Sequence, residues 1–250
     1  TARSMRADGV SGVATKTTDT DVVTAADRAV ERQVVAALRA LRPFDGVLGE
    51  EYGRAGADGP GPDPEVRWIL DPIDGTVNYL YGLPWYAVSL AAEVDGQVVA
   101  GVVHNGATGE EWTATRGGGA HHQGHRLTGS AETDLRQALV ATGFGYDAAR
   151  RAHQGEVLRQ LVPQVRDIRR FGAAALDLCL AATGAVDAYF EKGLAAWDRA
   201  AGELIATEAG LRVAGLGGNA AGPELVIAAP PALFAPLHDI LHRLDASGGP

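Results

Sequence analysis

The positions of apolar residues predict a helix near the start of the chain and a strand shortly after it. They recur at three- and four-residue intervals at Val30, Val34, Val35, Leu38 and Leu41. This spacing predicts a helix over residues 24–41, capped by Thr24 and stopped by Pro43. The Gly- and Pro-rich acidic stretch 53–65 predicts an exposed loop. The apolar run 68–70 predicts a short buried strand that leads directly to Asp71.

From residue 86 onward, the pattern predicts strands first and then alternating strands and helices. Strands are predicted at 88–91, 98–103 and 111–115, with Asp95-Gly96 and Thr108-Gly109 at the turns. Later strands are predicted at 138–142, 188–190 and 225–229. Helices are predicted at 150–161, 173–182, 198–209 and 231–244, and a loop at 217–222. Gly184 and Gly210 end the second and third of these helices.

This order of elements is typical of a layered fold, and periodicity alone leaves α/β and α+β both open. The 250 residues fit one large domain or two interlocked ones. The change from a β-rich middle to alternating strands and helices places a break near residues 130–135. We therefore predict an N-terminal half, 1–132, and a C-terminal half, 133–250.

Composition and charge exclude several classes of protein. The 22 Lys and Arg against 31 Asp and Glu give a net charge of −9, which disfavours nucleic acid as a partner. The single cysteine, Cys179, excludes an intramolecular disulfide framework and a Cys-rich zinc module, and it indicates a core residue in a reducing, cytoplasmic setting. The uncharged stretch 75–92 contains polar residues and a proline, so we expect no membrane span. No signal peptide is visible.

Two carboxylates, Asp71 and Asp74, follow the predicted strand 68–70 and are separated by Pro72 and Ile73. Proline stiffens the turn, and the glycine at position 75 permits close approach of a ligand to a helix start. Hard acid groups beside anion-binding amides are typical of a Mg²⁺ and phosphate site. The alternative is an ordinary Asp-Pro turn in which Asp74 caps a helix.

Two further acidic positions follow apolar residues in the same way. Glu50 and Glu51 come after residues 47–49, and Asp198 follows Trp197 at the start of a predicted helix. The glutamates could be a solvated pair, and Asp198 could be only the helix N-cap. Three separate junctions from apolar residues to acids nevertheless favour a shared site.

These segments carry a resemblance to a known family. The stretches 49–51 (Gly-Glu-Glu), 68–79 (Trp-Ile-Leu-Asp-Pro-Ile-Asp-Gly-Thr-Val-Asn-Tyr) and 197–210, beginning Trp-Asp, resemble the signature motifs of the inositol monophosphatase family. The resemblance runs from about residue 16 to the end of the chain. It implies a layered αβαβα sandwich, Mg²⁺-dependent hydrolysis of phosphomonoesters, lithium sensitivity and a homodimer.

The resemblance also implies a ligand set for two Mg²⁺ ions, with a third ion left open. Glu50, Asp71 and the backbone carbonyl of Ile73 would bind the first ion. Asp71, Asp74 and Asp198 would bind the second, so that Asp71 bridges both. Two such ions can neutralise a phosphate dianion and acidify a bound water.

Catalytic and phosphate-binding roles follow from the same resemblance. Glu50, Asp27 and Thr76 would be catalytic, with Asp27 as the partner of the Thr76 hydroxyl in orienting the attacking water. The alternative for Asp27 is a first-turn acid that favours the helix dipole. Asp74, Gly75 and Thr76 would hold the phosphate group. This site lies in the N-terminal half.

The substrate alcohol is assigned to the C-terminal half. Glu191 and the segment Gly172, Ala173 and Ala174 would contact its hydroxyl groups. The sequence departs from the family pattern at Ala173, where a hydroxyl residue is frequent, so only main-chain contacts are expected there. Without the resemblance, Glu191 would be interpreted as a surface acid at a strand end.

Several other polar residues allow more than one interpretation. His121, His122 and His125 could be a metal cluster, although the pattern favours a solvated turn in a β-hairpin. Arg166, Arg169 and Arg170 could line a phosphate entrance or a subunit contact. Lys16 resembles a family lysine near the metal loop but could be simply exposed. The chain has neither a P-loop nor a Gly-x-Ser-x-Gly elbow.

The sequence therefore predicts a cytoplasmic, Mg²⁺-dependent phosphatase of a small phosphomonoester, with inositol-1-phosphate as the favoured substrate and no membrane partner. Histidinol phosphate is the alternative on the same fold. Fructose 1,6-bisphosphate and 3′-phosphoadenosine 5′-phosphate are disfavoured, because no motif supplies a basic pocket for a second phosphate. A regulatory binding protein that retains the fold is the alternative from another class.

Overall fold

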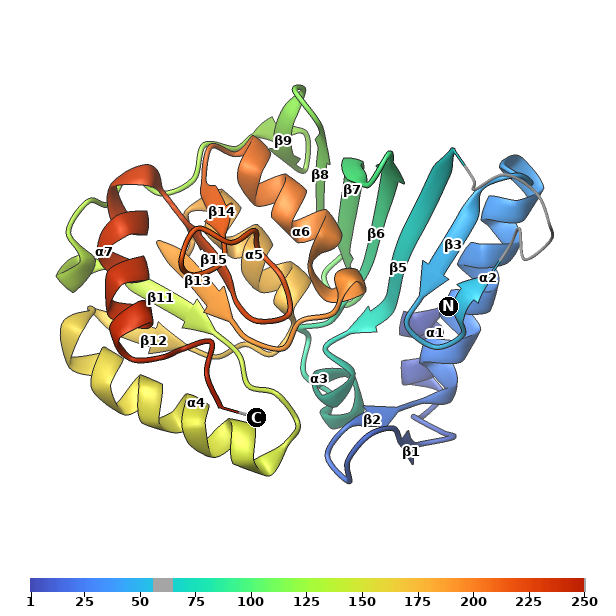
Figure 1. Ribbon diagram of the computed structural model, residues 1–250. Helices are drawn as coiled ribbons and strands as arrows, with labels where there is room; N and C mark the ends of the chain where they lie inside the picture. The colour runs from blue at the N-terminus through green and yellow to red at the C-terminus, as the bar shows by residue number, and fades with distance from the viewer. Residues whose placement is uncertain (56–64, 250) are drawn as a thin grey trace.

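The computed structural model describes residues 1–55 and 65–249, which form two large β-sheets with helices between and outside them (Figure 1). The first sheet has the strand order β10-β9-β8-β7-β6-β5-β3-β4, and the second has β12-β11-β13-β15-β14. The first sheet comprises β3 (Gly46–Gly49), β4 (Gly53–Ala55), β5 (Val66–Asp74), β6 (Ala87–Val94), β7 (Gln97–Asn105), β8 (Glu111–Thr115), β9 (Gly119–His122) and β10 (His125–Arg126). The second comprises β11 (Leu139–Thr142), β12 (Asp167–Arg169), β13 (Ala188–Glu191), β14 (Arg212–Ala214) and β15 (Val226–Ala229).

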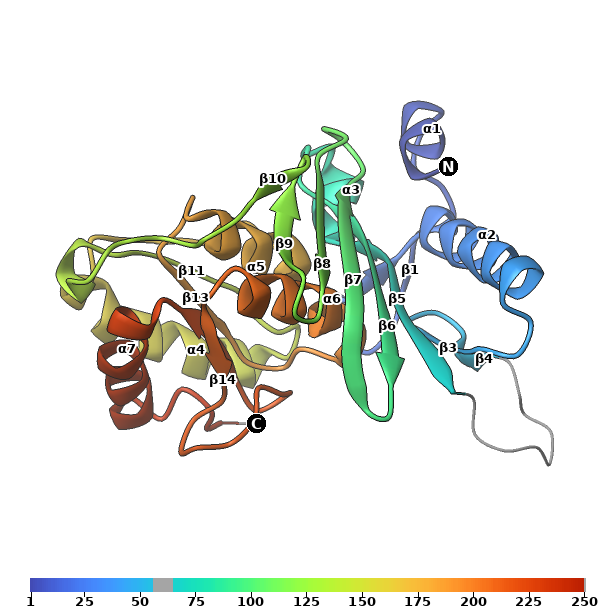
Figure 2. The same ribbon diagram turned by 90° about the horizontal axis from the view of Figure 1, so that it is seen from above.

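The helices complete five layers. They are α1 (Ala2–Ala7), α2 (Ala25–Leu41), α3 (Thr76–Tyr81), α4 (Ala148–Leu161), α5 (Ala174–Thr183), α6 (Ala196–Glu208) and α7 (Pro231–Arg243), with short 3₁₀ turns η1 (Leu135–Gln137) and η2 (Val162–Gln164) and a small ribbon of β1 (Ala14–Thr15) and β2 (Val22–Val23). Helix α2 packs on one face of the first sheet, α5 and α6 fill the space between the sheets, and α4 and α7 cover the second sheet (Figure 2). This arrangement confirms the predicted αβαβα sandwich.

Two large hydrophobic cores hold most of these layers together, and a third cluster, which includes Val30 and Tyr79, packs α1 and α2 on the first sheet. The larger core joins the first sheet to α5, α6 and the inner face of the second sheet, and it includes Trp112, Leu176 and Ile205. Cys179 is buried in this core, as predicted. The smaller core lies between the second sheet and α4 and α7. The long chain segment between β10 and β11 connects the two sheets, and the boundary at 132/133 stays a prediction.

Local sequence signals explain the elements that carry the site. The Thr24 hydroxyl caps α2 by accepting a hydrogen bond from the Ala26 N–H (3.1 Å), while Asp27 accepts one from the Thr24 N–H (2.8 Å). Asp95 and Gly96 both have positive φ, 50° and 73°, so the β6–β7 connection is the predicted Asp-Gly hairpin. Helix α2 packs against β5, and β6 pairs with it, so these two local signals help to position β5.

Several boundaries differ from the sequence predictions. Strand β5 does not stop before Asp71 but continues through Asp74, with an irregularity in its pairing to β6 where Pro72 has no N–H to donate. Helix α6 begins before Asp198, which therefore lies in its first turn and is not the N-cap. Residues 53–55 pair with β3 and are not part of a loop, while 56–64 of that predicted loop lie outside the described residues.

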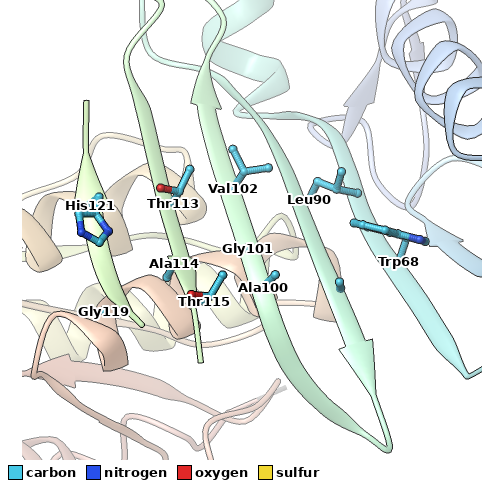
Figure 3. A pocket seen from close by; sticks show the side chains of 11 residues that line it. Trp68, Leu90, Ala100, Gly101, Val102, Thr113, Ala114, Thr115, Gly119 and His121 are labelled. Carbon is cyan, nitrogen blue, oxygen red and sulfur yellow. The ribbon is translucent and has the colours of Figure 1, made fainter. Parts of the chain in front are cut away.

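One hollow of about 320 Å³ lies on the face of the first sheet turned away from α5 and α6 (Figure 3). Its lining consists mainly of small and apolar side chains, with Trp68 at one side and His121 at the other. None of the predicted site residues lines it. Among the described residues, no helix is long and apolar enough to cross a membrane.

Candidate active site

Four predicted carboxylates form one cluster at the ends of strands of the first sheet. Strands β3 and β5 are parallel neighbours, so Glu50, just after β3, lies beside Asp71 near the end of β5. Asp198 approaches from the first turn of α6. Burial raises the pKa of Asp71 well above its ordinary value, and repulsion from Glu50, Asp74 and Asp198 raises it further. The fold thus gathers acids that are distant in sequence.

The backbone orients three of these carboxylates. Asp71 accepts a hydrogen bond from the N–H of Ile73 (3.0 Å), and Asp198 accepts one from the N–H of Ala195 (2.6 Å). Asp74 accepts from the N–H groups of residues 174 and 175, at 3.2 and 2.7 Å. The alternative in which Asp74 caps the helix directly after it is therefore wrong. Asp74 instead caps α5. The first N–H groups of that helix have no acceptor within the helix and therefore favour a negative charge.

Burial is the largest cause of the raised pKa values at this site. It raises the pKa of Asp198 to about 7, with a further contribution from Glu50. The pKa of Glu50 is raised for the same reason, although Lys16 opposes the shift. Asp71 is only 1% exposed and Asp74 only 8%. Such a group of buried acids is costly at neutral pH unless a positive charge compensates it.

Lys16 provides part of that compensation. Its Nζ is 2.7 Å from Glu50 Oε1, and it also bonds Glu51. Burial by itself would lower the pKa of Lys16, but Glu50 and Glu51 raise it. Glu50 and Glu51 are thus not a solvated pair, and Lys16 is not simply an exposed lysine.

The donor set fits a hard divalent cation by its chemistry. Carboxylate and carbonyl oxygens are the ligands that Mg²⁺ prefers, and the mutual repulsion that raises their pKa values is what a dication relieves. As the side chains stand, no three His, Cys, Asp or Glu side chains in residues 1–55 and 65–249 enclose a metal position.

The start of α3 adjoins the carboxylates, because Gly75 and Thr76 directly follow Asp74. Gly75 has φ +89°, a conformation that glycine adopts without strain. The Thr76 hydroxyl lies 3.0 Å from the carbonyl oxygen of Ile73 and 3.2 Å from Asp27 Oδ1. The predicted contact between Asp27 and Thr76 is therefore present. Asp27 is fully buried, and burial raises its pKa.

A cavity of about 590 Å³ extends from this point toward the second sheet. Its lining includes Asp74, Gly75, Gly172, Ala174, Glu191 and Asp198. Glu191 is not a surface acid: its Oε2 accepts a hydrogen bond from the Tyr189 hydroxyl (2.7 Å), and burial raises its pKa to about 6. Ala173 does not line the cavity but packs behind Gly75.

The structure adds residues that the sequence analysis did not assign. Phe144, Tyr146 and Lys192 also line the cavity. The arginine cluster divides, because Arg170 lines the cavity while Arg169 pairs with Asp167 (2.6 Å). Arg166 instead bonds Gln137. Arg170 stands two residues before Gly172, and this closeness in the sequence was the available signal that it lies at the cavity. The predicted hairpin of β9 and β10 carries His121, His122 and His125. There the ring of His122 stacks on that of Trp112, with 4.4 Å between the ring centroids.

Comparison with known proteins identifies the family. The model of the inositol monophosphatase family matches residues 2–245. This chain belongs to the inositol monophosphatase family. Its similarity to inositol-1-monophosphatase of Mycobacterium leprae is 46% identity over 245 residues, 96% of this chain and 84% of that protein.

Other inositol monophosphatase relatives carry different names. Nus factor SuhB of Pseudomonas aeruginosa is 44% identical over 193 residues, 76% of this chain and 70% of that protein. The structure of extragenic suppressor protein suhB from Bartonella henselae superposes with a TM-score of 0.87 and 35% identity, over 96% of this chain and 93% of that one. The family consists of phosphatases, which are generally metal-dependent.

Proposed function

We propose that this protein is a Mg²⁺-dependent phosphatase that hydrolyses inositol-1-phosphate or a similar polyol phosphate. The observation that carries the proposal is the cavity whose lining joins the acids Asp74 and Asp198 to Gly75 and to a half-buried hydroxyl acceptor, Glu191. A substrate placed there has its phosphate beside Gly75 and its alcohol toward Glu191. The identity to inositol-1-monophosphatases supports the same substrate.

Each residue of the site has a defined task in this proposal. Glu50, Asp71, Asp74, Asp198 and the carbonyl of Ile73 would hold two Mg²⁺ ions. Bound there, the ions would neutralise the phosphate dianion and lower the pKa of a bound water. The negative charge of the acids matters more than their shape, because that charge would hold the cations. The cations would in turn offset the repulsion between the phosphate dianion and a nucleophile.

The Asp27 and Thr76 pair orients the attacking water. The Thr76 hydroxyl has one hydrogen, and when it donates this hydrogen to Asp27, its oxygen remains an acceptor for a proton of the water. The N–H groups of Gly75 and Thr76 bind the phosphate. Glu191 accepts hydrogen bonds from the alcohol, which the main chain of Gly172 and Ala174 also contacts, and the Tyr189 hydroxyl holds Glu191 in place.

The test is phosphate release from inositol-1-phosphate, histidinol phosphate and p-nitrophenyl phosphate, each with Mg²⁺ and with a chelator. We expect release only with Mg²⁺ and the highest kcat/KM for inositol-1-phosphate. A higher kcat/KM for histidinol phosphate would reassign the substrate, since one buried carboxylate can equally accept bonds from an amine. Release that survives the chelator would refute the metal assignment.

A regulatory role is the second candidate, and the relatives named Nus factor SuhB favour it. The buried acids, with their raised pKa values, are costly to keep in a protein that only binds partners. We therefore place hydrolysis first. The same panel separates the two functions, because a purely regulatory protein releases no phosphate from any substrate. A homodimer in the cytoplasm completes the proposal, and sedimentation of the purified protein tests the dimer.

A further inference from the structure

Two buried polar side chains that the proposed mechanism does not use, Asn78 and Asp177, contact the same two chain segments. Asn78 is 5% exposed and lies on α3, three residues after Gly75. Asp177 is fully buried in the first turn of α5. They belong to opposite halves of the chain, yet both hydrogen-bond the loop at Trp85 and the loop before α5.

Asn78 holds these two loops by their carbonyl groups. Its Nδ2 donates to the carbonyl oxygens of Trp85 (2.9 Å) and Phe171 (2.8 Å), and the oxygen of Gly172 lies at 3.4 Å. One side-chain amide therefore ties a loop of the first sheet to a loop 86 residues later in the chain. Backbone carbonyls in loops have no ladder partner, so the amide also satisfies groups that are costly to bury alone.

Asp177 connects the same two segments from the first turn of α5. Its Oδ1 accepts a hydrogen bond from the indole Nε1 of Trp85 (3.3 Å), and its backbone N–H donates to the carbonyl oxygen of Ala173 (2.9 Å), where the loop before α5 ends. The rings of Trp85 and Phe171 pack at 5.5 Å between centroids. Within the described residues, Asp177 Oδ2 has no hydrogen-bond partner, so a buried acid is kept here at a cost to stability.

Gly75 lies between the two loops that these residues hold. A Cβ atom added at Gly75 would approach the Trp85 carbonyl oxygen to 3.0 Å, the Ala173 Cβ to 3.1 Å and the Gly172 carbonyl oxygen to 3.2 Å. Asn78 contacts two of these three atoms directly. The distance between the loops therefore fixes the position of the Gly75 amide and of the first N–H groups of α5, which bind Asp74.

We propose that Asn78 and Asp177 are positioning residues that form one polar clamp, the Asn78–Asp177 clamp, which sets the geometry of Gly75 and Asp74 for phosphate binding. The inference rests on the proposed role of Gly75 as a phosphate ligand. Neither residue lines the cavity, so neither touches the substrate. Loss of the clamp widens the slot around Gly75 and weakens every phosphomonoester equally, whatever its alcohol.

The experiment compares Asn78→Ala, Asp177→Ala, Asp177→Asn and the double alanine variant with wild type. The control is Leu237→Ala, which removes a fully buried side chain from the smaller core between α7 and the second sheet and so measures destabilisation alone. The readouts are KM and kcat for p-nitrophenyl phosphate, the inhibition constant of inorganic phosphate, and amide hydrogen exchange of residues 72–78 and 171–176. All assays are run well below each melting temperature.

We expect each alanine variant to raise KM and the phosphate inhibition constant together by about tenfold or more, with a smaller change in kcat. Asp177→Asn keeps an acceptor oxygen and should restore both constants to within about threefold of wild type. The double variant should lose no more than about threefold beyond the worse single variant, since either change opens the same clamp. Exchange should accelerate in both segments, not only around the substituted residue.

The clamp would be overturned if the alanine variants raised KM and the phosphate inhibition constant no more than Leu237→Ala does. It would also be overturned if the losses of the two single variants multiplied in the double variant. If Asn78→Ala does not fold, Trp85→Phe removes the indole donor while keeping a smaller aromatic ring against Phe171, and its phosphate inhibition constant decides in the same way. A wild-type protein that hydrolyses no phosphomonoester would contradict the proposed function alone. Hydrogen exchange would still show whether the two segments open together.

Discussion

The pKa of Glu191 gives a prediction about substrate choice that can be separated from the metal site. Burial raises this pKa to about 6, and the Tyr189 hydroxyl bonds the same carboxylate. A group with that pKa is about one-tenth ionised at pH 5 and about nine-tenths ionised at pH 7. The ionised carboxylate accepts hydrogen bonds from substrate hydroxyls more strongly than the protonated acid does.

We therefore expect the preference for inositol-1-phosphate over p-nitrophenyl phosphate to rise by up to about tenfold between pH 5 and pH 7. The assay measures kcat/KM for both substrates at each pH and takes their ratio. Titration of Asp71, Asp74 and Asp198 affects both substrates and cancels in the ratio. The second ionisation of each substrate's own phosphate does not cancel, so kcat/KM is expressed per concentration of the phosphate dianion. After this correction, only a group that contacts the alcohol remains visible in the ratio.

Glu191→Gln supplies the decisive comparison. Glutamine keeps the size of the side chain but does not titrate, so the ratio should become independent of pH and fall by about ten- to hundredfold at pH 7. Glu156→Gln, at an exposed position of α4, is the matched control and should leave the ratio unchanged. A flat ratio in wild type, or a rise that persists in Glu191→Gln, would remove Glu191 from alcohol recognition.

Three further predictions concern the carboxylate cluster. Asp71→Asn should lower kcat by about three orders of magnitude while raising the melting temperature of the chelated protein at pH 8, because it removes one of several repelling buried charges; activity above about a tenth of wild type would contradict its bridging role. Lithium, competing for the position made by Asp71, Asp74 and Asp198, should inhibit uncompetitively with respect to substrate, and purely competitive inhibition in steady-state kinetics would count against this. The folded pKa of Asp198 is about 7 against an ordinary 3.8, so between these values the folded chain holds a proton that the unfolded chain has lost, and stability falls as pH rises. Calorimetry of the chelated protein should accordingly give a lower melting temperature at pH 8 than at pH 6. Adding Mg²⁺ should raise the melting temperature more at pH 8 than at pH 6. Equal melting temperatures of the chelated protein at the two pH values would refute the predicted direction of the pH dependence.

The sequence by itself determined most of the helices and strands and the segments that carry the chemistry. Thr24, the Asp95-Gly96 turn and Gly184 act through local backbone preferences, which need no knowledge of the rest of the chain. The motif around Asp71 and Asp74 was equally visible, because its order of acids, proline, glycine and threonine is a local property. These signals led directly to the fold and the family.

Only the tertiary structure decided what each polar side chain bonds. Asp74 could have capped the helix next to it, but it binds the start of α5, one hundred residues later. Glu191, which resembles a surface acid in the sequence, is half-buried and bonded to the Tyr189 hydroxyl. Asn78 stands in the family motif without an assigned role, and Asp177 carried no signal, since an amide and an acid inside helices are ordinary until the loops at Trp85 and Gly172 pack against them. Burial and long-range hydrogen bonds depend on which layers meet, and that is set by the packing of α5 and α6 between the two sheets.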